Sequence, residues 1–217
     1  MAARRSQTTR AKAGPREQRR QTTAWEIREA ARALFHGRGF DETTTKDIAE
    51  RAGVAHGTVF LVAPTKEGLL VAALEEQLRG VVARRMATLP KRGVVAQLAH
   101  LMDGLFAFYA EDPRLARAFL RAILFPSDAV TTAMYEEHTT AFSARLAALV
   151  EAANVRGELA PRRDAEAAAD AVLGLYVVCL VAFLNTEGAD AASLKARFRA
   201  GLRTLLGRGG PRAPSRA

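Results

Sequence analysis

Along almost all of its 217 residues, this chain repeats hydrophobic side chains with the period of an α-helix. The spacing i, i+4, i+7, which places side chains on one helix face, is met by Ile27, Ala31 and Leu34 and recurs in later segments. No stretch alternates apolar and polar residues as a surface strand does. The pattern predicts an all-α protein, and a hydrophobic content of 49% can supply a buried core.

Capping residues, prolines and glycines indicate where these helices begin and end. Thr23, with Glu26 three residues later, forms a capping box that should open the first helix, and Gly37 and Gly39 should end it. Further helices are predicted from Thr44, around Val59 and Val62, from Thr65 to before Pro90, over 94–108, from Asp112 up to Pro126, from Val130 to near Gly157, from Asp164 to about Asn185, and from Ala191 to about Gly207.

The formal net charge of +9 is concentrated at the N-terminus. Residues 1–20 carry seven arginine and lysine residues against a single acidic residue, Glu17, and arginines also end the chain. Such a segment is either a solvated, unstructured end or an arm that lies along a polyanion such as DNA or an anionic membrane.

The number of cysteines and the length of the hydrophobic runs indicate the cellular compartment of the protein. Cys179 is the only cysteine, so no internal disulfide can form and a reducing compartment is expected. No apolar segment follows the N-terminal charges, which argues against a secretory signal. The longest apolar run, within 171–186, falls short of the roughly 20 residues that a membrane span needs. We therefore expect a soluble, cytoplasmic protein without a membrane partner.

The stretch "TTKDIAERAGVAHGTVF" at residues 44–60 has the spacing of a helix-turn-helix. Ala49 is small where a second helix must cross closely, and Gly53 can take the positive φ of a tight turn. Val59 and Val62 then face inward from the next helix. Such a corner can hold the second helix out to enter a major groove, although the same spacing permits an αα-corner that does not touch DNA.

Residues 23–70 resemble the DNA-binding domain of the TetR family of bacterial transcriptional regulators. The resemblance rests on "AARALF", on "GF" followed by a threonine cluster, on "IAERAGVA-GT" and on "TKEGLL". It implies an N-terminal three-helix DNA-binding domain joined through a long helix to a C-terminal helical domain for ligand binding and dimerisation. The expected divisions are a basic disordered tail at 1–20, a DNA-binding domain at 21–81 with its motif at 44–63, a ligand-binding and dimerisation domain at 82–207, and a disordered tail at 208–217.

The resemblance also implies which residues contact DNA. The contacts are expected from the start of the first motif helix, from the first turn of the second, and from the start of the long helix: Thr44, Thr45, Lys46, His56, Gly57, Thr58, Phe60 and Lys66. Hydroxyl and ammonium groups suit phosphate oxygens, and a threonine can also touch a thymine methyl. Thr44 and Thr58 could instead serve only as helix caps, and the two roles can coexist.

The motif departs from the family pattern at the second helix. Ala55 stands where Ser or Thr usually caps that helix, which should cost about 1 kcal/mol of local stability. Phe60 replaces a tyrosine, and Leu61 and Val62 replace an aromatic residue and a histidine. These changes remove phosphate contacts. Our hypothesis is that the arginine-rich tail compensates through counterion release and minor-groove insertion.

The C-terminal two-thirds hold most of the aromatic residues, and the resemblance places a small-molecule pocket there. Each of these side chains could also be plain core. Tyrosine and histidine combine polar tips with apolar surroundings, which suits ligand contact. The expected ligand-binding residues are Met102, Phe106, Tyr109, Phe119, Met134, Tyr135, His138, Phe142 and Tyr176.

The last two helices are expected to form a dimer interface. The segment 164–184 is apolar nearly all round and rich in small residues, as expected for a helix packed on two sides. Two copies of the helix pair would form a four-helix bundle, unless the first is the central core helix of a monomer. The predicted interface residues are Leu173, Val177, Leu180, Leu194, Phe198, Leu202 and Leu205.

Catalysis has little support in the sequence. The four histidines are scattered without metal-ligand spacing, and Cys179 lies in an apolar segment that favours inert packing. We therefore expect no enzyme activity, no metal and no cofactor. The predicted function is that of a homodimeric repressor, released from a two-fold symmetric double-stranded DNA operator by a small apolar or aromatic effector. The alternative is a helical adaptor that binds only other proteins.

Overall fold

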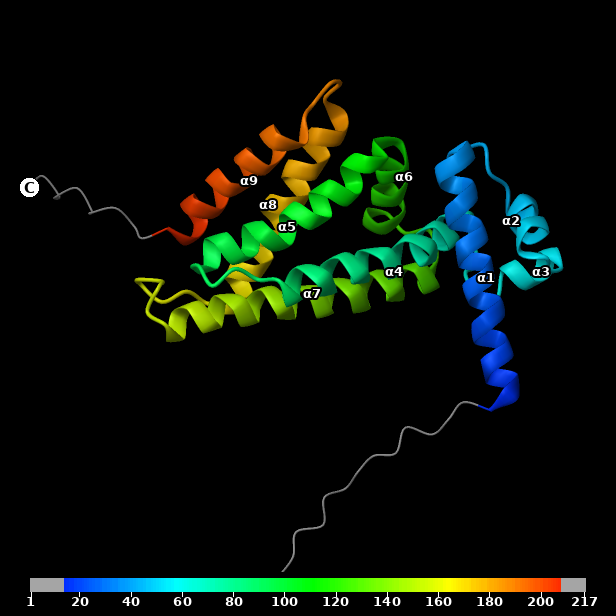
Figure 1. Cartoon of the computed structure of the whole chain (residues 1–217), viewed down its shortest axis with the longest axis horizontal. Coiled ribbons are helices and arrows are strands. Elements are labelled where there is room, and N and C mark those ends of the chain that lie inside the picture. Colours follow the sequence, from blue (N-terminus) through cyan, green and yellow to red (C-terminus); the bar gives the residue numbers. More distant parts are fainter. Residues whose placement is uncertain (1–13, 208–217) are drawn as a thin grey trace, which may run out of the picture.

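The computed structural model of the chain describes residues 14–207, and over that range it contains nine α-helices and no strand. The predicted all-α class is therefore confirmed (Figure 1). The helices are α1 (Pro15–Arg38), α2 (Thr45–Ala52), α3 (His56–Val59), α4 (Lys66–Ala87), α5 (Val94–Glu111), α6 (Pro113–Leu124), α7 (Ala129–Val155), α8 (Ala165–Asn185) and α9 (Ala191–Leu206).

The helices form two groups that share α4 (Figure 1). Helix α1 crosses the beginning of α4 and carries α2 and α3 on its outer side, whereas α5, α6 and α7 pack along the rest of α4. Helices α8 and α9 pack in turn against α7 and α5 and against each other. The first half of α4 is buried, with Leu70 and Leu74 inside the core. The domain boundary expected between residues 81 and 82 falls within α4, so one continuous helix belongs to both groups.

Helix α1 begins at Pro15, earlier than the predicted start at Thr23. Pro15 occupies the first helical turn and Glu17 lies in that turn, while the N–H of Gln18 donates to the carbonyl of Gly14 at 3.0 Å. The expected disordered tail over 1–20 is therefore wrong for residues 15–20, which form an exposed helical extension. Arginine, glutamine and glutamate are good helix formers and carry the helix past the Thr23 signal. Residues 1–13 and 208–217 lie outside the described residues, and the rest of both tail predictions lies there.

Helix α8 is longer than the apolar run that the sequence analysis compared with a membrane span. Its 21 residues are long and apolar enough to cross a membrane by length and composition, so the expectation that this segment is too short is wrong. The helix packs against α7 and α9, and Tyr176, Cys179 and Leu184 are buried in the core. However, only 33% of its most apolar stretch is buried in the single chain.

The turn glycine of the motif generates a stability prediction. Gly53 has φ 67° and ψ 31°, a left-handed conformation that an added Cβ disfavours, whereas Gly37 lies in the last turn of α1 with open space around it. We expect Gly53→Ala to destabilise the chain by about 1–2 kcal/mol and Gly37→Ala to stabilise it by up to about 1 kcal/mol. Urea unfolding measures both, and equal effects of the two alanines would contradict a strained turn at residue 53.

Candidate DNA-binding surface and effector cavity

Helix α2 is fixed at its N-terminus by a reciprocal capping box. The N–H of Asp47 donates to the Thr44 hydroxyl at 3.1 Å, and the N–H of Thr44 donates to the Asp47 carboxylate at 2.8 Å. The Thr44 hydroxyl also donates to this carboxylate at 2.7 Å. Hydrogen bonds from the Thr44 hydroxyl and N–H hold the pKa of Asp47 below its usual value. Thr44 therefore does serve as a cap, and its hydroxyl is engaged within the chain.

The turn after α2 sets the position of α3. The N–H of Val54 donates to the carbonyl of Ala49 at 3.0 Å as the chain turns at Gly53. Helix α3 spans only four residues and then continues as two tight turns, in which Leu61 and Val62 donate to the carbonyls of Thr58 and Val59. Val59 is buried in the core and anchors the segment. The opposite side of α3 faces solvent.

The exposed side of α3 carries the predicted DNA contacts. His56 and Gly57 are exposed and Thr58 is half-buried. The Nε2 atom of His56 lies 2.9 Å from the Thr45 hydroxyl, and its ring packs edge-on against Phe60 at 5.3 Å between centroids. The next residue, Leu61, is 78% exposed. The structure thus brings these side chains onto one outer surface of the motif, beside the exposed Lys46.

Lys66 is held by the chain itself. Its ammonium donates to the carbonyl of Phe40 at 3.0 Å and to that of Asp41 at 3.4 Å, and it lies 4.3 Å from the centre of the Phe40 ring. These contacts tie the start of α4 to the loop after α1. Because an ammonium has three N–H donors, one remains for a phosphate.

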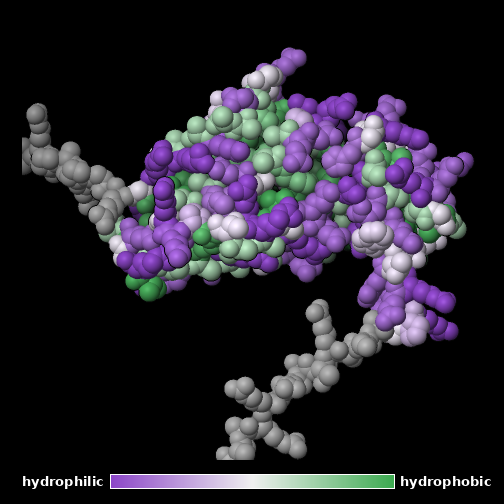
Figure 2. All heavy atoms as spheres, in the orientation of Figure 1, coloured by the Kyte–Doolittle hydropathy of each residue, from purple (hydrophilic) through white to green (hydrophobic). Residues whose placement is uncertain are grey.

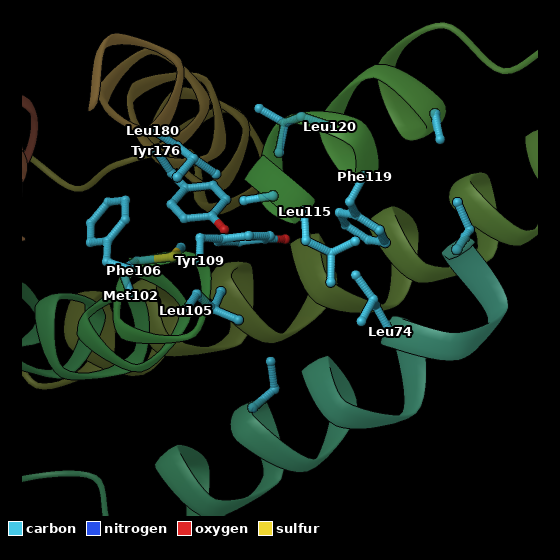
Figure 3. Close-up of a cluster of buried hydrophobic side chains, with 14 of the residues drawn as sticks. Leu74, Met102, Leu105, Phe106, Tyr109, Leu115, Phe119, Leu120, Tyr176 and Leu180 are labelled. Carbon is cyan, nitrogen blue, oxygen red and sulfur yellow. The ribbon is translucent and has the colours of Figure 1, made fainter. Parts of the chain in front are cut away.

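A cavity of about 520 Å³ lies between α4, α5, α6, α7 and α8, within the size range of about 300–1,000 Å³ for small-molecule sites. Seven of the nine predicted ligand residues line it: Tyr109, Phe119, Met134, Tyr135, His138, Phe142 and Tyr176. Met102 and Phe106 do not line it. They are fully buried behind it, where the Phe106 ring packs 5.2 Å from the ring of Tyr176 (Figure 3).

Two tyrosines lie at the buried side of the cavity. Tyr109 and Tyr176 lie side by side, and the Tyr109 ring is 6.1 Å from that of Phe119 (Figure 3). Burial raises the pKa of both phenols, so both hydroxyls stay protonated at neutral pH. This wall of the cavity can therefore donate hydrogen bonds but carries no charge.

The α4 and α7 sides of the cavity carry charged groups. Glu75 contacts His138, and its carboxylate lies 2.9 Å from Arg79, one turn along α4. Burial raises the pKa of Glu75, against the opposing influence of His138 and Arg79. Arg145 of α7 completes the charged lining. Sequence reasoning missed Glu75, Arg79 and Arg145, although Glu75 and Arg79 lie at helical spacing among the apolar residues of α4 and could have been noticed there.

Four of the predicted dimer residues face the wrong way for an interface. Leu180, Leu194, Phe198 and Leu202 are buried inside the single chain. Leu173 and Val177 line the cavity instead, and Leu205 is half-buried. The error has a physical cause: a helix that is apolar all round shows no preferred face in its sequence, so the sequence does not tell which side a subunit keeps for itself.

The histidines stay apart. His36 lies 3.7 Å from Asp112, His56 contacts Thr45, His100 lies 3.1 Å from the hydroxyl of Thr88, and His138 contacts Glu75. Within residues 14–207, no group of three or more His, Cys, Asp or Glu side chains could hold a metal ion.

Comparison with known proteins finds a family match over the N-terminal part and one curated relative over most of the chain. The family model for bacterial regulatory proteins of the tetR family matches residues 27–73. Over 86% of its length the chain is 27% identical to the HTH-type transcriptional repressor KstR of Rhodococcus jostii strain RHA1, of which 84% is covered.

Solved structures agree with this similarity. Thermus thermophilus FadR, a TetR family transcriptional repressor solved in complex with lauroyl-CoA, is 28% identical, with a TM-score of 0.70 over 89% of this chain and 99% of that one. FadR of Bacillus subtilis in complex with stearoyl-CoA, at 20% identity, shares the fold with a TM-score of 0.65 over 85% of this chain and 99% of that one.

The missing cap of α3 generates a second stability prediction. Ala55 has the extended backbone of an N-cap residue, with ψ 143°, but makes no side-chain cap hydrogen bond. Ala55→Ser should place a hydroxyl against the N–H groups of the first turn and stabilise the chain by about 1 kcal/mol. Thermal unfolding measures this gain. Ala55→Val, which adds bulk without an acceptor, is the control, and an equal gain from valine would contradict the capping explanation.

Proposed function

We propose that this chain is a DNA-binding transcriptional repressor of the TetR type that responds to a small ligand, in keeping with the tetR family match over residues 27–73 and the similarity to KstR. The observation that carries the proposal is the exposed outer surface of α3, held by a buried Val59 and a left-handed Gly53, on a chain that also encloses an apolar cavity. The homologous repressors support this function over that of an adaptor that binds only proteins. Such a regulator works in the cytoplasm, where its DNA is.

In the proposed complex, α3 enters the major groove with its first turn toward the bases. Gly57 allows the backbone to approach closely, and Thr58 and Phe60 meet base edges and thymine methyl groups. Lys46 and the remaining N–H of Lys66 bind phosphates on either side. Thr45 acts through its contact with His56, which holds the imidazole at the surface. The Thr44 hydroxyl, already bound to Asp47, contributes by fixing α2.

The proposed active form is a homodimer joined through α8 and α9. The face of α8 that the single chain leaves uncovered includes Ala171, Gly174 and Val178, and Val178 is 56% exposed. Hydrophobic side chains reach the visible surface over α8 and α9, whereas the end formed by α1 to α3 is mostly hydrophilic (Figure 2). A second copy would cover this apolar surface and place two α3 segments on half-sites about 34–36 Å apart.

The proposed effector is an apolar molecule that occupies the cavity between α4 and α7. Val71, Leu78 and Val82 of α4 line the cavity, and the same helix begins directly after the motif. A ligand that fits the cavity only when α4 has moved would favour the state in which the two α3 segments no longer match the operator. A shift from about 99% bound to about 1% bound requires roughly 10⁴-fold preference for the moved state.

The proposal is tested on the full chain by selecting sites from a random duplex library and footprinting the result. We expect a two-fold symmetric footprint with half-sites one helical turn, or a multiple of it, apart. Val178→Glu should give a monomer and lower the affinity for the selected site at least about 100-fold, because it places an unpaired charge in the dimer interface.

The control is Val155→Glu, which adds the same charge at a residue that is 76% exposed at the end of α7. It should remain dimeric and bind as the wild type does. If no sequence is selected, the repressor function is wrong. If Val178→Glu remains a dimer with full affinity, the interface is wrong.

A further inference from the structure

We propose that a second site, separate from the cavity between α4 and α7, binds a nucleoside monophosphate. The site is a groove of about 800 Å³ between the start of α5, the loop after α7 and the end of α9. Within residues 14–207 it shares no lining residue with the first cavity. These elements lie at the opposite end of the molecule from α1, α2 and α3 (Figure 1). The inference goes beyond the proposed function, because it concerns a different site and a different class of ligand.

The rim of the groove carries more guanidinium groups than the chain neutralises. Arg92, Arg199 and Arg203 line it, and all three are exposed. Arg199 pairs with the carboxylate of Asp103. In the part of the chain that the structure describes, neither Arg92 nor Arg203 has a carboxylate within ion-pair distance. Two guanidinium groups therefore stay available for the paired hydrogen bonds that arginine forms with a phosphate.

The other acidic residue of the groove, Glu158, is already engaged by the chain. Its carboxylate accepts from the Nε of Arg156 at 2.6 Å and from the N–H of Val94 at 2.9 Å. These two hydrogen bonds hold the pKa of Glu158 below its usual value, against the effect of burial. Because Arg156 offsets the charge of Glu158, the groove as a whole keeps an excess of positive charge.

Asp103 supplies an acceptor that the chain leaves unused. Its side chain is mostly buried, and its Oδ2 atom accepts from Arg199. Its Oδ1 atom is buried and, among the described residues, has no hydrogen-bond partner. Rotation about the last side-chain bond exchanges the two oxygens, so a ligand hydroxyl in the groove can donate to this carboxylate and remove the cost of the missing bond. An acidic side chain that accepts from a ribose hydroxyl is a known way to hold a nucleotide.

The floor of the groove is apolar. Val94, Ala99, Leu159 and Leu206 line it and are buried, and His100 adds an imidazole ring to the lining. A flat heteroaromatic base can pack on such a floor and stack on such a ring. Three features of one groove thus match three parts of one molecule: the apolar floor matches the base, the unused carboxylate oxygen matches a ribose hydroxyl, and the unpaired guanidinium groups match the phosphate.

The test measures the affinity of the full-length chain for AMP, GMP, CMP and UMP by isothermal titration calorimetry at about 150 mM salt. We expect at least one to bind with a Kd below about 1 mM. It should bind at least about tenfold more tightly than its nucleoside, which lacks the phosphate, and than ribose 5-phosphate, which lacks the base. Its 2′,3′-dideoxy form, which lacks both ribose hydroxyls, should also bind about tenfold more weakly.

Variants locate the bound nucleotide. Arg203→Gln, which keeps much of the aliphatic stem and removes the charge, should weaken binding of the nucleotide about tenfold and leave binding of the nucleoside unchanged. Two matched controls remove a positive charge elsewhere: Arg145→Gln in the lining of the first cavity and Lys46→Gln on the exposed surface of the motif. Neither control should change the affinity. Thermal unfolding without ligand checks that each variant is folded.

Each outcome decides the inference. A nucleotide whose binding is weakened by Arg203→Gln and unchanged by both controls supports it. The inference is overturned if none of the four nucleotides binds below about 1 mM, or if the nucleoside or the dideoxy form binds as tightly as the nucleotide. It is also overturned if Arg145→Gln or Lys46→Gln weakens binding and Arg203→Gln does not. The selected operator site and its footprint decide the repressor function separately in every case.

Discussion

A hydrogen-bonded junction fixes the start of α4 against the start of α7. The Thr65 hydroxyl accepts from the N–H of Gly68 at the start of α4 and donates to Asp128 at 2.9 Å, and Asp128 accepts from the N–H of Thr131 at the start of α7. The two helix ends can meet because residue 68 is glycine: a Cβ there would lie 2.8 Å from the Thr131 hydroxyl. Helices α4 and α7, which form two walls of the cavity, thus begin next to each other.

In the proposed mechanism, α4 is the link between the cavity and the helix-turn-helix motif. Its first turn is tied to the motif side by Lys66 and to α7 by Thr65, and its later turns form a wall of the cavity. Glu75 makes a second connection to α7 through His138. Because a close-packed core changes between discrete arrangements rather than deforming continuously, a ligand between α4 and α7 is expected to move α4 as a unit.

Structural features could be predicted from the sequence where the signal came from residues only a few positions apart. Thr44 with Asp47, and Asp112 with Pro113, form the expected helix starts because capping involves residues only a few positions apart. The positive φ of Gly53 was likewise predictable from the turn that the motif requires. The face that α8 keeps for its own subunit was not, because beyond Glu166 and Asp170 near its start the helix is apolar on nearly every side.

The charged lining of the cavity could not be predicted from neighbouring residues in the sequence either. Glu75 and Arg145 are far apart in the sequence, and only the crossing of α4 and α7 brings them to one cavity. A capping signal can also mislead: the Thr23 box was overridden because the preceding residues favour a helix on their own.

The central claim, that occupancy of the cavity moves α4 and with it the motif, is tested most directly by a distance between the two motifs of the dimer. A spin label at Glu50→Cys on the exposed side of α2, in a Cys179→Ala background, reports that distance by double electron–electron resonance. The account predicts one narrow distribution on operator DNA and a shift to longer distances when a ligand occupies the cavity. A chain whose cavity is occupied with no change in the distance distribution would contradict it.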